Sequence, residues 1–488
     1  MRRLYLAVFA IGLAVYTIAA WGRIWQQSGA PHFVYQADAW LHGTVAIAAS
    51  CGDPGQRVCG KNETPLPADD WATVETVELD DGTTVQGRRL IQTRQAFRLL
   101  DGSTIATTRI KRSVGYTAYV SFPPVPSLLM VPGALISGRD GNDVIPTLVI
   151  AALILPLALL VLRRLADAGL SVRTVREDLW LVGMLAFGSV LFFAAIQGKV
   201  WYTAHVVGVA LALAYAWASI EARHPIVAGL ALGAAALTRT SMAFMLPLFV
   251  YEVWRMAAKA TADAVPANAS GKLDLREGRR AMLRAIRRPL LELAIPVLVL
   301  AIAGALYNYI RFESPTEFGH SYLALGNRQP VRQQLQIEQW GLASYHYLGR
   351  NLAVAFTLLP ELLPRAPWVQ ISGHGLAMWV TTPALLLLVW PRTKGPLHRV
   401  LWLTTLFVAL PSLFYMNSGW FQFGYRFSLD YMVFLMMLLA VGGRPLGRVA
   451  KTLIVIGVLV NLFGAYTFDR HNEYYRYGGN AYDVVVPH

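Results

Sequence analysis

Long apolar stretches recur along the whole chain, and short polar segments separate them. A helix needs roughly 20 mostly apolar residues to cross a bilayer, and about eleven stretches approach that length. They lie near residues 4–21, 145–162, 179–196, 205–220, 225–237, 240–254, 289–308, 375–390, 400–416, 429–443 and 451–467. The stretches on either side of Thr238 and Arg239 are short, and we interpret them as a tight helical hairpin. The pattern predicts an all-α polytopic membrane protein.

Residues 51–119 follow a different pattern, in which turns separate short runs of alternating apolar and polar residues. Asp-Gly pairs ending at Gly82 and Gly102 lie between such runs, and this dipeptide is typical of a β-hairpin. We therefore expect a small β-rich insertion on the extracytoplasmic side, too short to form a spanning barrel. Cys51 and Cys59 lie in this insertion and are predicted to form a disulfide in an oxidising compartment; two free thiols are the alternative.

The insertion and the apolar stretches divide the chain into successive parts. These parts are the first transmembrane helix (1–21), a juxtamembrane helix (22–50), the β-rich insertion (51–119), transmembrane helices (120–308), a second extracytoplasmic loop (309–374), further transmembrane helices (375–467) and an extracytoplasmic tail (468–488). Pro123, Pro124 and Pro126 follow the insertion, and prolines this dense exclude a regular helix. This segment is expected to re-enter the membrane as a structured loop.

Composition and charge agree with this topology. Hydrophobic residues make up 55% of the chain and charged residues 15%, whereas about a quarter of residues are charged in soluble proteins. If the basic N-terminus stays in the cytoplasm on an uncleaved first helix, the basic loops at 163–178, 255–288, 391–399 and 444–451 also lie inside, as the positive-inside tendency requires. The net charge of +14 therefore reports membrane orientation and argues against nucleic acid as a partner.

An acidic residue stands at the outer edge of the membrane, on a helix expected over residues 32–43. Helical spacing places Tyr35, Asp38 and His42 on one face. Other residues of this helix are apolar and are expected to dip into lipid: Phe33, Val34, Trp40 and Leu41. A partly desolvated carboxylate holds a proton more readily, which suits Asp38 to general-base catalysis. A solvated Asp38 on an interfacial helix explains the spacing equally well.

The second extracytoplasmic loop opens with Arg311, Glu313, Glu317 and His320. The E-x-x-H spacing of Glu317 and His320 occurs in carboxylate-bridged metal sites, but a single copy lacks the further ligands that such sites need. Arg311 lies at a predicted helix end, where it either snorkels to the interface or faces a cavity. A metal site is the less favoured interpretation of this loop.

Three cations lie in short turns on the outer side: Lys199, Arg239 and Arg426. A cation near membrane depth is costly unless it meets an anion, so each is a candidate phosphate ligand. The alternatives are snorkelling for Lys199, a capping contact for Arg239, and an i,i+4 ion pair between Arg426 and Asp430. The chain contains no G-x-x-x-x-G-K-[ST] phosphate loop, so an ATP-driven motor is unsupported.

Segments 35–43, 311–319 and 423–431 resemble those of a known group of enzymes. With an Asp shortly after the first transmembrane helix and two large outside loops, they are similar to the GT-C superfamily of integral membrane glycosyltransferases. Within it they resemble the bacterial protein mannosyltransferase and aminoarabinose transferase families, which depend on polyprenyl-phosphate sugars. The resemblance implies that Asp38 is the catalytic base. Ala39 stands where the protein mannosyltransferases have the second acid of an Asp-Glu pair, and this difference argues against a protein acceptor. The sequence alone does not select among a lipid, a glycan and a protein.

The resemblance implies an inverting glycosyltransferase in the cytoplasmic membrane of a bacterium. It would move a sugar from a polyprenyl-phosphate donor to an acceptor hydroxyl at the outer face. The residues expected to bind the donor phosphate or sugar are Arg426, Arg239, Arg311, Lys199, Tyr35, His42, Glu313, Glu317, His205 and Tyr425. A single phosphate requires no cofactor to neutralise it, although a divalent metal is compatible. The alternatives are a secondary transporter or flippase for an anionic or lipid-linked substrate, and a non-catalytic assembly partner.

Overall fold

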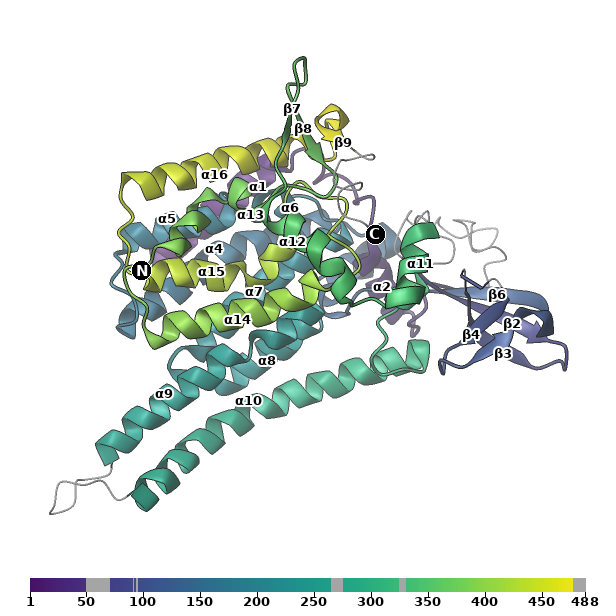
Figure 1. Cartoon of the computed structure of the whole chain (residues 1–488), viewed down its shortest axis with the longest axis horizontal. Helices are drawn as coiled ribbons and strands as arrows, with labels where there is room; N and C mark the ends of the chain where they lie inside the picture. Colours follow the sequence, from purple (N-terminus) through teal and green to yellow (C-terminus); the bar gives the residue numbers. More distant parts are fainter. Residues whose placement is uncertain (50–70, 91, 94, 265–274, 324–330, 477–488) are drawn as a thin grey trace.

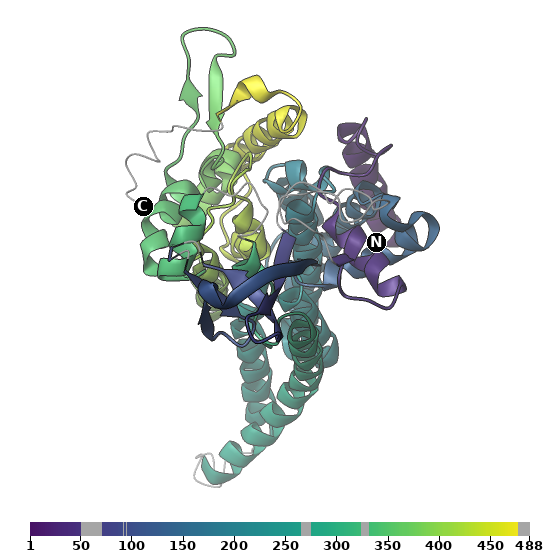
Figure 2. The same cartoon turned by 90° about the vertical axis from the view of Figure 1, so that its right-hand side faces the viewer.

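A computed structural model describes the chain except for residues 50–70, 91, 94, 265–274, 324–330 and 477–488. Cys51 and Cys59 lie outside the described residues, and so does the disulfide predicted between them. Most helices run alongside one another in an elongated bundle, and a β-sheet projects from one end (Figure 1). Figure 2, viewed from that end, shows the sheet in front of the bundle.

Six helical segments in the described part of the chain are long and apolar enough to cross a membrane. They are α1 (Arg2–Ala19), α4 (Val144–Asp167), α7 (Val200–Ser219, continued to Ala222), α10 (Leu275–Phe312), α14 (Pro396–Leu413) and α16 (Arg448–Thr467). The multi-pass character predicted from the sequence is thus present, whereas the count of about eleven spans is not confirmed. Helix α10 also runs further than the apolar stretch 289–308, so Arg311 belongs to its last turn.

The other apolar stretches form shorter or interrupted helices. They are α5 (Val175–Ala186) with α6 (Leu191–Ala195), α8 (Pro225–Ala236), η5 (Thr240–Met245) with α9 (Pro247–Ala264), α13 (Met378–Thr381) with η8 (Pro383–Val389), and α15 (Leu429–Val441). Pro247 and Pro383 each stand at the first position of a new helix, where a missing N–H costs least. Helix α15 is almost entirely buried, which explains why its sequence is apolar on every side.

The β-rich insertion forms one antiparallel sheet with the strand order β1-β6-β2-β3-β4-β5. Its strands are β1 (Ala48–Ala49), β2 (Trp71–Leu79), β3 (Thr84–Arg89), β4 (Ala96–Leu99), β5 (Thr104–Ala106) and β6 (Ile110–Val120). Both predicted hairpins occur, β2 with β3 and β4 with β5. Gly82 and Gly102 have φ values of 82° and 88°, the left-handed conformation that these tight turns need. Val77, Leu79 and Phe97 form the sheet's own small core.

A second, smaller sheet was not predicted. It joins β7 (Glu361–Leu362), β8 (Val369–Ser372) and β9 (Tyr475–Arg476). The remaining short helices of the C-terminal half are η6 (His320–Tyr322), α11 (Val331–Trp340), η7 (Tyr345–Tyr347), α12 (Leu348–Phe356), η9 (Arg426–Ser428) and η10 (Asn472–Tyr474). Strand β9 pairs in parallel with β8, so the segment after α16 is tied to the segment between α10 and α13.

The predicted surface helix is α2 (His32–Leu41), but its surroundings differ from the expectation. Phe33 and Val34 are buried inside the protein rather than dipping into lipid. They pack in one cluster with Phe122 and Met130, from the proline-rich segment that follows the sheet. That segment folds into η2 (Val125–Leu129), α3 (Val131–Ser137) and η3 (Gly138–Asp140), which cover α2. The periodicity of α2 alone cannot show that segments distant in the sequence will cover this helix.

Candidate active site

A cavity of about 480 Å³ lies where several distant segments meet. We call it the cationic cavity, because Arg239 and Arg426 both line it. Aromatic side chains form much of its wall, among them Phe122, Trp201 and Phe427. Its remaining lining comes from residues 238–241, 316–323, 342–343 and 411–417, including Glu317 and His320. The structure therefore brings together four of the polar residues that the sequence had singled out.

Arg239 is held from behind by a buried carboxylate. It follows α8 in an extended conformation, and its Nη2 lies 3.0 Å from Oδ2 of Asp430 while its Nε lies 3.2 Å from Oδ1. Asp430 also accepts a hydrogen bond from Ser241 Oγ at 2.6 Å and lies 2.9 Å from Nδ1 of the buried His205. A buried carboxylate needs such partners to remain charged. Arg239 is thereby fixed in place beside the cavity.

Asp430 had been considered as an i,i+4 partner of Arg426, but its ion pair is with Arg239. Arg426 begins η9 and donates through Nη1 to the backbone carbonyls of Gly419 and Phe421. Its guanidinium also lies 5.4 Å from the ring centre of Phe427. These contacts hold the second cation against the cavity wall.

Tyr425 and His205 lie behind the cationic cavity and do not line it. Tyr425 is fully buried, with its Oη 3.5 Å from Oγ of Ser412, which does line the cavity. His205 reaches the cavity only through Asp430 and Arg239. Both residues were predicted to bind substrate, and the structure places them behind residues that face the cavity.

Glu317 is the carboxylate in the lining of the cationic cavity, and one of its oxygens stabilises a backbone turn. Its Oε1 accepts hydrogen bonds from the backbone N–H of Gly319 at 2.6 Å and of Ser321 at 3.4 Å, closing the turn before η6. The ring of His320 packs against Phe122 and Tyr415. Over the residues that the structure describes, no group of three or more His, Cys, Asp and Glu side chains is arranged to hold a metal ion.

Glu317 also lines a second cavity of about 330 Å³, which we call the polar pocket. The polar pocket lies between the sheet and the second outside loop, and its lining includes Arg88, Arg98, Asp101 and Glu313. Glu313 directly follows α10 and has a φ of 52°, an uncommon conformation for a residue other than glycine. The shared Glu317 makes the two cavities neighbours.

Asp38 lies outside the cationic cavity, in a separate group of side chains that we call the α2 cluster: Tyr35, Asp38, His42 and Arg139. Oδ2 of Asp38 is 3.3 Å from Nε of Arg139, and Oδ1 is 3.5 Å from Nδ1 of the exposed His42. The Arg139 guanidinium also lies 5.6 Å from the ring centre of Tyr35. Burial raises the pKa of the Tyr35 hydroxyl. Tyr35, Asp38 and His42 thus share one helix face, as predicted, and the guanidinium of Arg139 lies beside it.

Arg139 and Asp143 were missed by the sequence reasoning. Arg139 comes from η3, 101 residues after Asp38, and no local pattern connects the two. Asp143 precedes α4 and accepts hydrogen bonds from the N–H and the Oγ of Ser28, at 2.9 and 2.5 Å. Burial raises the pKa of Asp143 to about 6, against the opposing effect of these hydrogen bonds. The only available signal was the position of Asp143 directly before an apolar stretch, which is typical of a helix start.

Helix α2 carries Asp38 and also a residue that packs against the lining of the cationic cavity. His32, in the first turn of α2, has ring centres of Phe122 and Trp201 at 6.0 Å each, and both of these residues line the cavity. Asp38 lies further along the same helix. The carboxylate and the two cavity arginines therefore belong to neighbouring but distinct regions.

Arg311 and Lys199 do not line the cationic cavity. Arg311 is buried and donates to Val120 O at 2.6 Å and to Asn308 Oδ1 at 2.8 Å, so it does not snorkel. Lys199 forms an ion pair with Asp469 at 2.8 Å. Both cations have protein partners: the contacts of Arg311 tie α10 to β6, and those of Lys199 tie the start of α7 to the segment after α16.

No protein-family model and no curated protein matches this chain. Among solved structures, the chain is similar to the oligosaccharyltransferase of Archaeoglobus fulgidus in its apo form, with 11% identity and a TM-score of 0.39 over 98% of this chain and 56% of that one. It is also similar to the archaeal oligosaccharyltransferase AglB from Archaeoglobus fulgidus in complex with an inhibitory peptide and a dolichol-phosphate, with 9% identity and a TM-score of 0.41 over 98% and 57%. The chain spans little more than half the length of these neighbours.

Proposed function

We propose that this protein is a membrane glycosyltransferase that moves a sugar from a polyprenyl-phosphate donor to an acceptor hydroxyl at the outer face of the membrane. The observation that carries the proposal is the cationic cavity, whose lining contains both Arg239 and Arg426. Their guanidinium groups lie 5.1 and 5.4 Å from the ring centre of Phe427. The resemblance of residues 35–43, 311–319 and 423–431 to polyprenyl-phosphate-dependent enzymes supports the same class of donor.

The two guanidinium groups suit a phosphate. Arginine presents planar, always charged donors that match phosphate oxygens, often two at a time. Asp430 and backbone carbonyls hold Arg239 and Arg426 in place before any substrate binds. Donors fixed in advance in a site with little water stabilise charge that develops on a leaving group. The departing polyprenyl phosphate is that group, and its single phosphate makes a metal compatible but not required.

Asp38 is the proposed catalytic base. The acceptor hydroxyl oxygen forms a bond to the anomeric carbon, the bond from that carbon to the phosphate oxygen breaks, and the hydroxyl proton moves to the Asp38 carboxylate. Direct displacement inverts the anomeric centre and requires the base on the side of the sugar opposite to the leaving group. A carboxylate that adjoins the cationic cavity without lining it is compatible with this requirement.

The other carboxylate near the phosphate site is a weaker candidate for the base. Glu317 lines the cationic cavity, but its Oε1 already accepts two backbone hydrogen bonds. Asp38 is bound only by side chains, those of Arg139 and His42, among its described contacts.

The test uses purified protein reconstituted in liposomes and a panel of polyprenyl-phosphate sugars with lipid, glycan and protein acceptors. We expect a covalent sugar–acceptor product from the wild type and its loss in Asp38→Asn and Arg426→Gln. Asp140→Asn is the matched control, because Asp140 is exposed and lies beside Arg139. Movement of a labelled anionic solute or lipid across the membrane without any covalent product would instead establish the transporter or flippase.

A further inference from the structure

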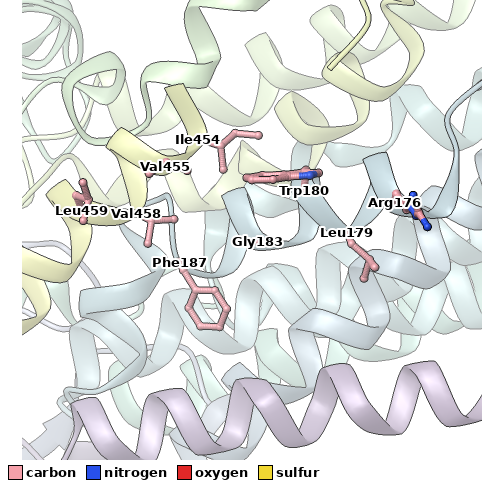
Figure 3. Close-up of a pocket in the computed structure, with 9 residues that line it drawn as sticks. All are labelled: Arg176, Leu179, Trp180, Gly183, Phe187, Ile454, Val455, Val458 and Leu459. Atoms are coloured by element: carbon pink, nitrogen blue, oxygen red, sulfur yellow. The ribbon is translucent and has the colours of Figure 1, made fainter. Parts of the chain in front are cut away.

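An apolar groove of about 440 Å³ runs along the bundle between α5 and α16 (Figure 3). Its apolar lining consists of Leu179, Trp180, Gly183, Phe187, Ile454, Val455, Val458 and Leu459. Arg176 is the one charged residue among the lining residues. We call this feature the α5/α16 groove. It shares no lining residue with the cationic cavity or the polar pocket, so a ligand of this groove is independent of the proposed function.

Positive charge is concentrated at one end of the α5/α16 groove. Arg176, at the end of the row in Figure 3, is exposed and has no hydrogen-bond or ion-pair partner among the described residues. Lys451, in the first turn of α16, is also exposed, and its Nζ lies 5.6 Å from the ring centre of Trp180. Both cations are therefore available to an anion from outside the protein.

The acids closest in sequence to Arg176 have other partners. Asp178 is buried and pairs with Arg163 at 2.7 Å. Glu177 closes the capping box of α5 with Thr174 and lies 3.5 Å from Arg173. Neither carboxylate neutralises Arg176, so the end of the groove keeps its positive charge.

We propose that the α5/α16 groove binds an anionic phospholipid of the surrounding bilayer. One acyl chain lies along the apolar lining, and the headgroup phosphate meets Arg176 and Lys451. From Arg176 to Phe187 the groove follows α5 for roughly 16 Å at 1.5 Å per residue. One leaflet of a bilayer has a hydrocarbon thickness of about 15 Å, half of the whole core. The groove thus matches one leaflet in length and places its cations at the level of the headgroups.

Headgroup charge distinguishes this site from ordinary contact with lipid. A zwitterionic lipid offers the same chains but brings a positive amine to the two cations. Each basic residue near a lipid surface favours an anionic lipid about fivefold, so two of them give a preference of roughly thirtyfold. The preference, rather than lipid binding as such, is the property to measure.

The experiment titrates purified full-length protein with phosphatidylglycerol or phosphatidylcholine of identical chains and counts bound lipids by native mass spectrometry. We expect the first phosphatidylglycerol to bind roughly thirtyfold more tightly than phosphatidylcholine. Arg176→Gln combined with Lys451→Gln should reduce this ratio to near one. Arg392→Gln combined with Lys394→Gln is the control, since these exposed residues carry the same charge and lie outside the groove.

A second variant fills the α5/α16 groove without touching its charge. A Cβ added to Gly183 would meet no atom within 4 Å, so Gly183→Leu fits on α5 and occupies the space of the acyl chain. We expect this variant to lose the tight site while its thermal unfolding stays as cooperative as that of the wild type. Equal binding of the two lipids to the wild type would overturn the proposal. So would an unchanged preference in the double variant or in Gly183→Leu.

Discussion

The cationic cavity and the α2 cluster use charge in opposite ways. In the cavity, the buried Asp430 and backbone carbonyls hold Arg239 and Arg426 from behind. In the α2 cluster the acid is the residue held in place, with Arg139 on one oxygen of Asp38 and His42 near the other. One region presents fixed positive charge to an open space, and the other presents negative charge beside it. Displacement of a phosphate by a hydroxyl requires one region of each kind.

The largest expected effect comes from the α2 cluster. Asp38→Asn keeps the size of the side chain and removes the proton acceptor, so transfer should fall roughly a hundredfold to ten-thousandfold. Initial rates of product formation in liposomes measure it, with Asp140→Asn expected to stay near the wild-type rate. A wild-type rate in Asp38→Asn would remove the α2 cluster from the chemistry.

The cationic cavity should show the next largest effect. Arg426→Gln removes one fixed donor from the leaving phosphate, and transfer should fall roughly a hundredfold to a thousandfold. Arg426→Lys keeps the charge without the planar fork and should recover part of the rate. Arg239 is a poorer target, because its removal would leave the buried Asp430 without its cation. A rate in Arg426→Gln equal to that of the wild type, in protein with unchanged thermal unfolding, would contradict the phosphate assignment.

The stability of the region around α2 should also depend on pH. Asp143 binds Ser28, just before α2, and burial raises its pKa to about 6 in the folded protein. The folded state therefore holds a proton more firmly than the unfolded state, whose carboxyl titrates near 3.9. The stabilisation from that proton is complete below about pH 4 and is lost as the pH rises through about 6.

Asp143→Asn should abolish this dependence. Relative to the variant, the wild type should lose about 2 kcal/mol of stability between pH 4 and pH 7, at 1.36 kcal/mol per unit of pKa. Thermal unfolding of both proteins in detergent at several pH values gives the difference. A difference that is constant with pH would mean that Asp143 is not protonated in this window.

The smallest effect is expected for Glu317. The amide oxygen of Glu317→Gln can still accept the hydrogen bonds from Gly319 and Ser321, so transfer should stay within about fivefold of the wild type, about 1 kcal/mol. Rates measured beside those of Asp38→Asn make the comparison direct. A loss in Glu317→Gln as large as that in Asp38→Asn would place the base inside the cationic cavity.

Local signals in the sequence were sufficient for the features that depend on local geometry. The turns at Gly82 and Gly102 and the helix over residues 32–41 follow from residue type and spacing, and the structure contains all three. The number of spans was harder to predict, because a buried helix such as α15 is as apolar as a spanning one while being only 13 residues long.

The contacts between distant segments could not be predicted. Asp38 meets Arg139 across 101 residues, and Arg239 meets Asp430 across 191. Arg311 looked like the other candidate cations in sequence, but the carbonyl of Val120 and the amide of Asn308 satisfy it inside the protein. Only the folded structure distinguishes a cation with internal partners from one that faces a cavity.

Binding of sugar-free polyprenyl phosphate tests the central claim most directly, because it separates the phosphate site from the chemistry. Titration of reconstituted protein should give the same affinity for the wild type and Asp38→Asn, and an affinity at least about tenfold weaker for Arg426→Gln, as expected for the loss of a charge-assisted hydrogen bond. Equal affinity in the wild type and Arg426→Gln would contradict the claim that the cationic cavity binds the phosphate. A loss of affinity in Asp38→Asn as large as in Arg426→Gln would contradict the claim that Asp38 acts only in the chemical step.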